Sequence, residues 1–449
     1  MTVGEDPGLQ AEGPDEPARS RLLTLARQVA VDIGPLRDSR HFRRLFFGDA
    51  VSLIGTQMTA VAVPVQMFAL TKSSFAVGML GLAALVPLVV FGIIGGAIAD
   101  AMDRRRLVLM TSAGAAVVSM LLLLQAVLDV GQPWLLYVLV FAQAALFAVD
   151  SPARRSLIPR LIAPSQIPAA SALGQAMFSF GVVLGPLVGG SLIGAFGLSW
   201  AYAIDVCSFG AALWAAALLP SLRPEGGGRA AGVGSILEGL RFLRTKPVVL
   251  MTFAVDINAM VFGMPRALFP ALAVGTFGGG PRTVGLLYAA PAAGALLAAV
   301  LSGWLGQVRR QGLAVLFAVA AWGAAIVAFG LTSTLWLGLL MLAIAGAADM
   351  VSAVFRTAIL TAATPDELRG RLSGVFIAVV AGGPRLGDVE AGAVAAVSST
   401  QVSVVSGGVA CIIGVLLLGL AIPSFARYDA AAPDAADPDD AAPADAADP

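Results

Sequence analysis

Twelve runs of mainly apolar residues, each near 20 residues long, constrain this chain more than any other feature. A helix of about 20 residues crosses the hydrocarbon core of a bilayer, because each residue adds about 1.5 Å. Only 12% of the residues are charged, against about 25% in soluble proteins. We therefore predict an all-α membrane protein in contact with the lipid bilayer. The predicted spans are 45–70, 76–99, 106–128, 134–153, 168–195, 199–219, 248–275, 282–306, 312–331, 335–360, 370–397 and 402–424.

A polar interval divides these spans into two groups of six. We expect an N-terminal six-helix bundle at 45–219 and a C-terminal six-helix bundle at 248–424, joined by a central cytoplasmic loop at 220–247. Residues 1–44 are expected to form a polar cytoplasmic segment. The acidic tail, 425–449, is dominated by Ala, Asp and Pro and should be disordered, because it has almost no apolar surface to bury.

The distribution of positive charge predicts the orientation in the membrane. With twelve spans, the lysines and arginines lie on the same side of the membrane as the two termini. Of the 28 in the chain, the exceptions are Lys72, Arg266, Arg282 and Arg385. Such an excess marks the cytoplasmic side of a membrane protein. Arginine greatly outnumbers lysine, which is typical of a GC-rich bacterial genome. We expect a multi-pass protein of the bacterial cytoplasmic membrane with both termini in the cytoplasm.

The fifth predicted span contains an unusual concentration of glycine. Residues 180–191 read FGVVLGPLVGGS, with small residues or proline at Gly181, Gly185, Pro186, Gly189 and Gly190. Glycines four residues apart share one helix face, so the backbone of another helix can approach closely there. A related pattern, GGPRLG, returns at 382–387 in the second group of spans. This repetition predicts a transporter built from two related halves.

The loop after the second span carries a recognisable motif. GGAIADAMDRRRL at 95–107 resembles the signature between helices 2 and 3 of the major facilitator superfamily, Gly-x-x-x-Asp-(Arg)-x-Gly-Arg-Arg, with Ala101 and Asp103 departing from it. The matching positions are Gly96, Asp100, Arg104 and Arg105. The resemblance implies twelve transmembrane helices in two pseudo-symmetric six-helix bundles. The alternative interpretation is a charged loop end that only sets topology.

In that superfamily this loop forms a conformational latch between the halves. The resemblance implies that Asp100 caps the start of helix 11, where a helix N-terminus favours negative charge. It also implies that Arg104 pairs with Asp150 at the end of helix 4. The corresponding loop of the second half, at 303–312, lacks the aspartate, so a weaker latch is expected there.

Other stretches narrow the resemblance to exporters. The glycine pattern at 181–190 is similar to the helix 5 motif called the antiporter motif, and 150–173 and 349–392 resemble the enterobactin exporter branch. This implies a secondary active transporter that exports a small organic molecule, siderophore-like or drug-like, by alternating access with ion antiport. The fourth span lacks the arginine of many proton-coupled exporters and has Gln143 as the polar residue of YVLVFAQAALFAV.

Polar residues inside the spans are candidates for substrate binding and coupling, because they are costly in lipid and usually face the bundle interior. Asp256 is the best candidate for a protonatable carboxylate, although it could instead pair with Asn258 or with a neighbouring helix. Arg385 could bind an anionic or catechol-like substrate, or pair with Asp388 one turn on. Each neutral residue could equally form an interhelical hydrogen bond. The candidates are Gln57, Gln66, Gln143, Asp256, Asn258, Arg266, Arg385 and Asp388.

Several function classes are disfavoured by the sequence. The formal net charge of zero gives no indication of nucleic-acid binding. His41 is the single histidine, and neither HExxH, GxSxG nor a phosphate-binding loop occurs. We expect no catalytic residues, metal site or cofactor, and therefore no enzyme. Our main interpretation is a monomer that binds a small-molecule substrate and a coupling ion, expected to be a proton. The alternative is a non-transporting receptor or assembly partner on the same scaffold.

Overall fold

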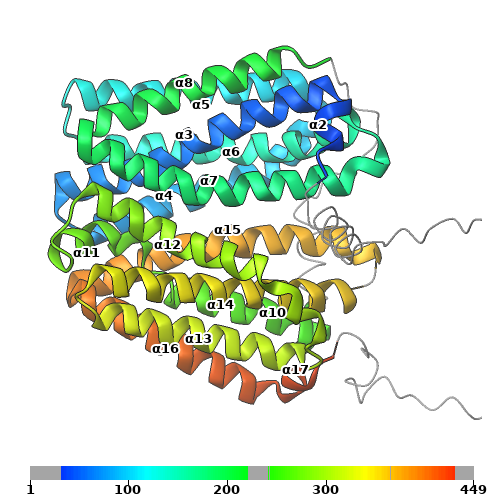
Figure 1. Ribbon diagram of the computed structural model, residues 1–449, viewed down its shortest axis with the longest axis vertical. Helices are drawn as coiled ribbons and strands as arrows, with labels where there is room; N and C mark the ends of the chain where they lie inside the picture. The colour runs from blue at the N-terminus through cyan, green and yellow to red at the C-terminus, as the bar shows by residue number, and fades with distance from the viewer. Residues whose placement is uncertain (1–31, 221–240, 242, 365, 430–449) are drawn as a thin grey trace, which may run out of the picture.

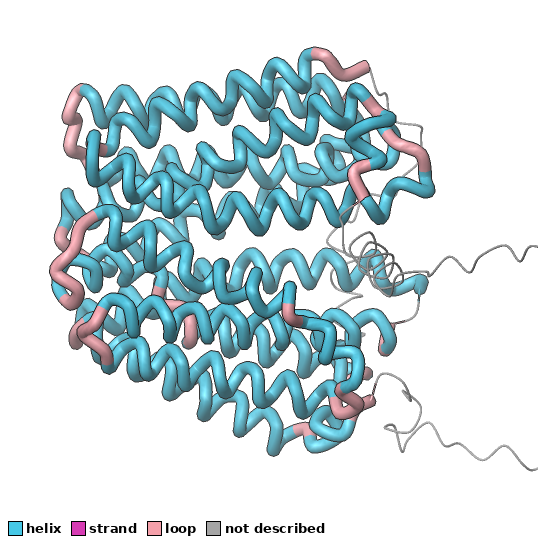
Figure 2. The backbone as a smooth tube through the Cα atoms, viewed as in Figure 1, coloured by secondary structure: helices cyan, strands magenta, loops and turns pink. Residues whose placement is uncertain are grey.

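The computed structural model describes residues 32–220, 241, 243–364 and 366–429, and the long elements in them are helices (Figures 1 and 2). The first half contains α3 (Arg40–Thr71), α4 (Ser74–Ala101), α5 (Arg104–Val127), α6 (Pro133–Leu161), α7 (Ile167–Phe196) and α8 (Leu198–Ala217). The second half contains α10 (Pro247–Phe262), α11 (Phe269–Gly275), α12 (Pro281–Val300), α13 (Gln311–Leu331), α14 (Leu335–Ala362), α15 (Asp366–Val397) and α16 (Thr400–Ala421). Short helices are α2 (Gly34–Asp38), η1 (Pro164–Gln166), η2 (Arg266–Leu268), η3 (Ser302–Gln307) and α17 (Pro423–Arg427).

Each half forms a bundle, and the two bundles lie one above the other in Figure 1. In the first, α3 packs against α7 and α8, and α4 against α6; in the second, α13 packs against α14 and α16, and α10 against α15. The end of the molecule with α2 and α17 is called the terminal face here. The opposite end, with the turns at 72–73, 197 and 276–280, is called the distal face. Successive long segments run alternately between the two faces.

The helix ends follow from local chemistry. The Ser73 hydroxyl accepts the amide of Ala76 at 3.3 Å at the start of α4. Asp103, which departs from the superfamily signature, accepts the amides of Arg105 at 2.9 Å and Arg106 at 3.2 Å and so caps α5. A carboxylate at this position satisfies free N–H groups and favours the positive end of the helix dipole. The departure at Asp103 therefore has a structural role.

The outer surface is apolar over most of its height. Large hydrophobic side chains such as Phe317, Trp336 and Leu420 are 68%, 76% and 77% exposed. A soluble monomer rarely exposes so extensive an apolar surface, whereas lipid tails cover it in a membrane. In the described part of the chain, eleven segments are long and apolar enough to span a membrane. The remaining predicted span, the eleventh at 370–397, corresponds to α15.

Two predicted spans differ most from the observed helices, and the eighth, predicted over 282–306, is an α-helix only to Val300 and continues as η3. The fourth was expected to end at 153, but α6 continues to Leu161, because prolines at 152 and 159 do not interrupt it. The seventh was expected to be continuous over 248–275, but it breaks after Phe262. Gly263 and Pro265 occupy the break, and the Trp322 indole donates to the freed carbonyl of Gly263 at 2.9 Å. A proline has no N–H to donate, and an indole compensates for the interrupted helix.

Candidate functional site

The glycine face of α7 packs against α3 inside the first bundle. A Cβ added to Gly181 would lie 2.6 Å from Cδ2 of Leu53, and one added to Gly189 would lie 3.0 Å from Cα of Met58. Gly185 lies just as close to Gln57. The close approach of another helix, predicted from the spacing, is thus present. Gln57 is part of this packing contact.

The adjacent face of α7 meets α12 of the other half. A Cβ on Gly190 would lie 2.6 Å from the carbonyl oxygen of Pro281 and 2.8 Å from Cα of Gly285. Gly285 in turn contacts the carbonyl of Pro186. We call this contact the glycine seam. It lies near the distal face, since α12 begins there, and backbone meets backbone across it.

A second contact between the halves joins α4 to α15, also in their distal parts. A Cβ on Gly81 would lie 2.6 Å from the carbonyl oxygen of Arg385 and 3.0 Å from Cβ of Asp388. Gly392 approaches the carbonyl of Ser74, with 2.8 Å from its would-be Cβ to that oxygen. We call this contact the charged seam, because the ionisable residues Arg385 and Asp388 lie within it.

The charged seam includes the break in the seventh span. The Asp388 carboxylate accepts the Ala267 amide at 3.1 Å, and the Tyr288 hydroxyl donates to the Arg266 carbonyl at 3.2 Å. The guanidinium groups of Arg266 and Arg385 are the charges that attract Asp388. Arg385 itself donates to the carbonyl of Ala381. The predicted pairing of Arg385 with Asp388 is therefore an electrostatic attraction. Arg266, which was not predicted to take part, attracts the same carboxylate.

An arginine cluster crosses three helices of the first half, nearer the terminal face. Arg154 of α6 forms ion pairs with Asp49 of α3 and with Asp150, and it donates to the Ser112 hydroxyl at 2.7 Å. Thr111 donates to Asp150 at 2.5 Å. Two carboxylates thus share one guanidinium, whose fixed fork can bond both at once.

The second half repeats this arrangement. Arg356 of α14 forms an ion pair with Asp256 of α10, and its other nitrogen lies 3.6 Å from Asp349. Asp256, predicted as a protonatable carboxylate, is thus held by a cation from a neighbouring helix, which was the alternative. Each half therefore has a partly buried arginine between two aspartates.

The expected partner of Arg104 is wrong. Asp150 is bound by Arg154, which lies four residues away on the same helix, whereas Arg104 donates to the Ser156 carbonyl at 3.5 Å. Arg105 donates to the Ala217 carbonyl at 2.6 Å and so joins α5 to the end of α8. The side chains at Gly96 and Asp100 lie outside the described residues, so the latch with helix 11 stays a prediction.

The neutral candidates form contacts between helices. Gln66 exchanges hydrogen bonds with Gln125 at 2.9 Å in both directions, and it accepts the Tyr202 hydroxyl at 2.7 Å. Asn258 donates to the Cys411 carbonyl at 2.9 Å. Within the described part of the chain, the buried side-chain oxygen of Gln143 accepts no hydrogen bond. The structure thus favours a packing role for Gln66 and Asn258 and leaves Gln143 as a polar atom without a partner.

Sequence reasoning missed Arg154 and Arg356 as site residues, because both were counted only as positive charges on the cytoplasmic side. The signal was present in the first half, where Arg154 follows Asp150 by four residues and so shares its helix face. In the second half Arg356 follows Asp349 by seven residues, again on one face. Their partners Asp49 and Asp256 come from other helices, and spacing along the chain cannot indicate such contacts.

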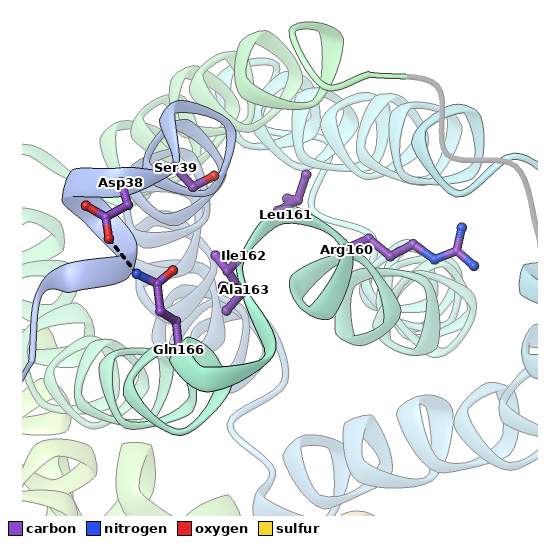
Figure 3. A pocket seen from close by; sticks show the side chains of 7 residues that line it. All are labelled: Asp38, Ser39, Arg160, Leu161, Ile162, Ala163 and Gln166. Atoms are coloured by element: carbon purple, nitrogen blue, oxygen red, sulfur yellow. Dashed lines mark hydrogen bonds between the residues drawn. The ribbon is translucent and has the colours of Figure 1, made fainter.

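One surface cavity of about 420 Å³ lies at the terminal face of the first half (Figure 3). It is lined by Asp38, Ser39, Arg160, Leu161, Ile162, Ala163 and Gln166. The Gln166 amide donates to Asp38 at 2.6 Å across its rim. This cavity lies within the first half, apart from both seams, so we do not place the substrate there.

The molecule has two pseudo-symmetric helical bundles, which are joined by small-residue contacts and contain paired charges at membrane depth. These features define a transporter of the major facilitator superfamily. The chain belongs to the family described as transmembrane secretion effector (MFS_3), whose profile matches residues 30–443. Members of this superfamily are transporters rather than enzymes. The chain is accordingly a multi-pass membrane transporter with the predicted twelve-helix fold.

Relatives and solved structures agree. The chain is 27% identical over 402 residues to the enterobactin exporter EntS of Citrobacter koseri, covering 89% of this chain and 95% of that protein. It is 29% identical to the enterobactin exporter EntS of Shigella boydii serotype 18, covering 86% and 93%. The fold matches a bacterial homologue of the lysosomal transporter Spinster, with a TM-score of 0.68, 17% identity and coverage of 88% and 99%. It also matches a bacterial homologue of the iron transporter ferroportin, with a TM-score of 0.63, 15% identity and coverage of 87% and 99%.

Proposed function

We propose that this protein exports a small anionic organic molecule from the bacterial cytoplasm by alternating access, coupled to proton antiport. It acts as a monomer in the cytoplasmic membrane with both termini inside, so that the terminal face is cytoplasmic. The bundles at 45–219 and 248–424 are the two bodies that move, and the interval 220–247 connects them.

The observation that carries this proposal is where the halves touch. Among the described glycines, those in close contact across the halves lie in the distal or middle parts of their helices, at Gly78, Gly81, Gly190, Gly285, Gly382 and Gly392. The two arginine clusters nearer the terminal face each join helices of one half only. This pattern supports a state closed at the distal face. The opposite state would separate both seams and bring the terminal ends together, where the predicted latch at Gly96 and Asp100 would hold.

The charged seam supports an anionic substrate. Two guanidinium groups, from Arg266 and Arg385, attract the Asp388 carboxylate and are the cations of the charged seam. A guanidinium presents planar paired donors that suit carboxylate or catecholate oxygens. The related proteins named enterobactin exporters support a siderophore-like substrate.

Accumulation and release of compounds by whole cells test this function. A bacterial strain without its own siderophore exporter would express this protein, and secreted enterobactin and a panel of anionic and cationic drugs would be quantified in medium and cells. We expect the protein to increase release of catecholate or other anionic compounds. No release of any compound, despite normal insertion in the membrane, would contradict export and favour a receptor or assembly partner.

A further inference from the structure

One carboxylate in the first half has a different environment from those described above. Asp205 of α8 is 0% exposed and lies inside the bundle formed with α3 and α5. Asp49, Asp150, Asp256 and Asp349 interact with arginine, and Asp388 is attracted by two of them. The groups around the Asp205 carboxyl are instead hydroxyls, from Thr59, Ser119 and Ser208.

The hydrogen bonds of Asp205 are unequally divided between its two oxygens. Thr59 of α3 donates to Oδ2 at 2.9 Å, and Ser119 of α5 donates to the same oxygen at 2.7 Å. The Ser208 hydroxyl donates to the main-chain carbonyl of Asp205 at 2.7 Å, and the other carboxyl oxygen, Oδ1, is buried without a hydrogen-bond partner among the described residues. An ionised carboxylate has equivalent oxygens that both need donors, whereas a protonated acid has one accepting oxygen and one O–H. A buried oxygen without a donor costs more free energy when it is charged than when it is neutral, so this arrangement favours the protonated form.

The surroundings also favour a proton over a metal cation. A Cβ added to Gly55 would lie only 2.9 Å from Oδ1, so the α3 backbone closes that side of the carboxyl. A metal cation needs several oxygen ligands around it, and this packing leaves no room for a full shell. A proton needs no such space, and burial away from cations disfavours the charged form of a carboxyl.

Other ionisable groups around Asp205 are few. Tyr202 lies one turn away on α8, and its hydroxyl is already donated to Gln66; α7 contains no ionisable residue. On α3 the nearest ionisable residue is Asp49, about 15 Å from Thr59 along the helix, and it is paired with Arg154. On α5 the arginines lie in the first turn, and Arg105 bonds the end of α8. Among the described residues of α3, α5, α7 and α8, the proton on Asp205 therefore has no charged competitor close by.

We infer that Asp205 is a proton-binding site of the first half, occupied in this distal-closed conformation and emptied in the opposite state, in which α8 parts from α3 or α5 far enough for water to reach the carboxyl. Its use in antiport rests on the proposed function. The binding step adds a proton to a carboxylate oxygen, and its reversal returns that proton to water, so no further reactant is needed. The site differs from Asp256, because here no ion pair has to break before the proton is exchanged.

Infrared difference spectroscopy of the purified full-length protein tests the protonation without any substrate. We expect the C=O stretch of a protonated carboxylic acid near neutral pH, its loss at alkaline pH, and its absence in Asp205→Asn. Asn keeps an oxygen for the Thr59 and Ser119 hydroxyls, so this variant should fold. Glu390→Gln is the matched control, because Glu390 is a half-buried carboxyl on a spanning helix and its removal should leave the band in place. A band that persists in Asp205→Asn would overturn the assignment.

A distance measurement tests the release of the proton. Spin labels would replace Phe196 and Trp336, which are 64% and 76% exposed near the distal face, in a background with Cys207 and Cys411 replaced by serine or alanine. We expect the distance distribution of the parent protein to shift between acidic and alkaline pH, and that of Asp205→Asn to stay as at acidic pH. An unchanged response in Asp205→Asn would overturn the exchange. A response to sodium at constant pH that this variant loses would overturn the choice of a proton. Failure of export with both signals intact would contradict the proposed function alone.

Discussion

The glycine seam and the charged seam both join the two halves, at places related by the pseudo-symmetry of the fold. They differ in chemistry. At one, Gly190 of α7 meets Gly285 of α12, with no side chain between the backbones. At the other, Asp388 occupies the corresponding place on α15 and faces Gly81 of α4. Both seams lie in the distal part of the molecule, as Figure 1 shows for α4, α12 and α15.

This difference in chemistry determines which of the two contacts can respond to charge. Separating the glycine seam exposes only backbone and small side chains, whose hydrogen bonds stay inside their helices. Separating the charged seam breaks the bond from Ala267 to Asp388 and moves Arg266 and Arg385 relative to that carboxylate. We expect the glycine seam to act as a close-packed seal and the charged seam to be the one on which an anionic substrate acts.

Gly190→Ala should produce the largest effect and would break the seal. Its Cβ would lie 2.6 Å from the Pro281 carbonyl oxygen, and backbone cannot move aside cheaply in a packed interface. We expect export to fall at least about tenfold, which corresponds to about 1.4 kcal/mol against the closed state. Export from cells, normalised to protein in the membrane, measures this.

Gly194→Ala is the matched control for that substitution. Its Cβ would have its nearest neighbour at 3.8 Å, an ordinary contact, and α7 is otherwise unchanged. Export by Gly194→Ala should stay close to that of the parent protein. If Gly190→Ala behaves like the control, the glycine seam does not seal the distal face.

Arg385→Gln should have the next largest effect and would separate structure from binding at the charged seam. Loss of this cation leaves Asp388 with Arg266 as its attracting charge, so folded yield should fall. Arg385→Gln combined with Asp388→Asn should restore the yield, measured by fluorescence-detected size exclusion, but not the export of anionic compounds. Full recovery of export in the double variant would show that Arg385 only balances charge.

Tyr288→Phe should have a smaller effect. It removes the hydrogen bond to the Arg266 carbonyl at the helix break, worth about 1 kcal/mol, and leaves the ring packed on Phe269. We expect the apparent affinity for an anionic substrate to fall a few-fold. Tyr137→Phe removes a comparable bond, to the Ala76 carbonyl in the first half, and should leave that affinity unchanged. Equal effects of the two would mean that the bond at Arg266 has no special role.

Asp100→Asn should have the smallest effect, because it acts at the terminal end of α4 rather than at either seam. The predicted latch would hold α4 against α15 in the opposite state. The substitution removes a charge with little change in volume, so export rate should fall while expression is retained. Transport assays with expression measured in parallel decide this, and a normal rate would leave the loop with a role in topology only.

From the amino-acid sequence alone we could predict the membrane class, the number of spans and the close helix approach at α7. These follow from local quantities: apolar run length, alternating positive charge and glycine spacing along one helix. It also indicated Arg385 and Asp388 as neighbours, since they are three residues apart. The break after Phe262 was not predicted, because a proline near a helix end and one inside a continuous helix look alike in sequence. Pro186 and Pro384 lie inside continuous helices.

The partners of the charged side chains became known only from the three-dimensional structure. Asp256 has Arg356 from another helix, and Asp150 has Arg154 rather than Arg104. The Asp205 carboxyl accepts hydroxyls from α3 and α5. Each of these depends on how far one helix is shifted and rotated against another. That geometry is set by packing summed over whole helix faces, and residue spacing within a single helix does not contain it.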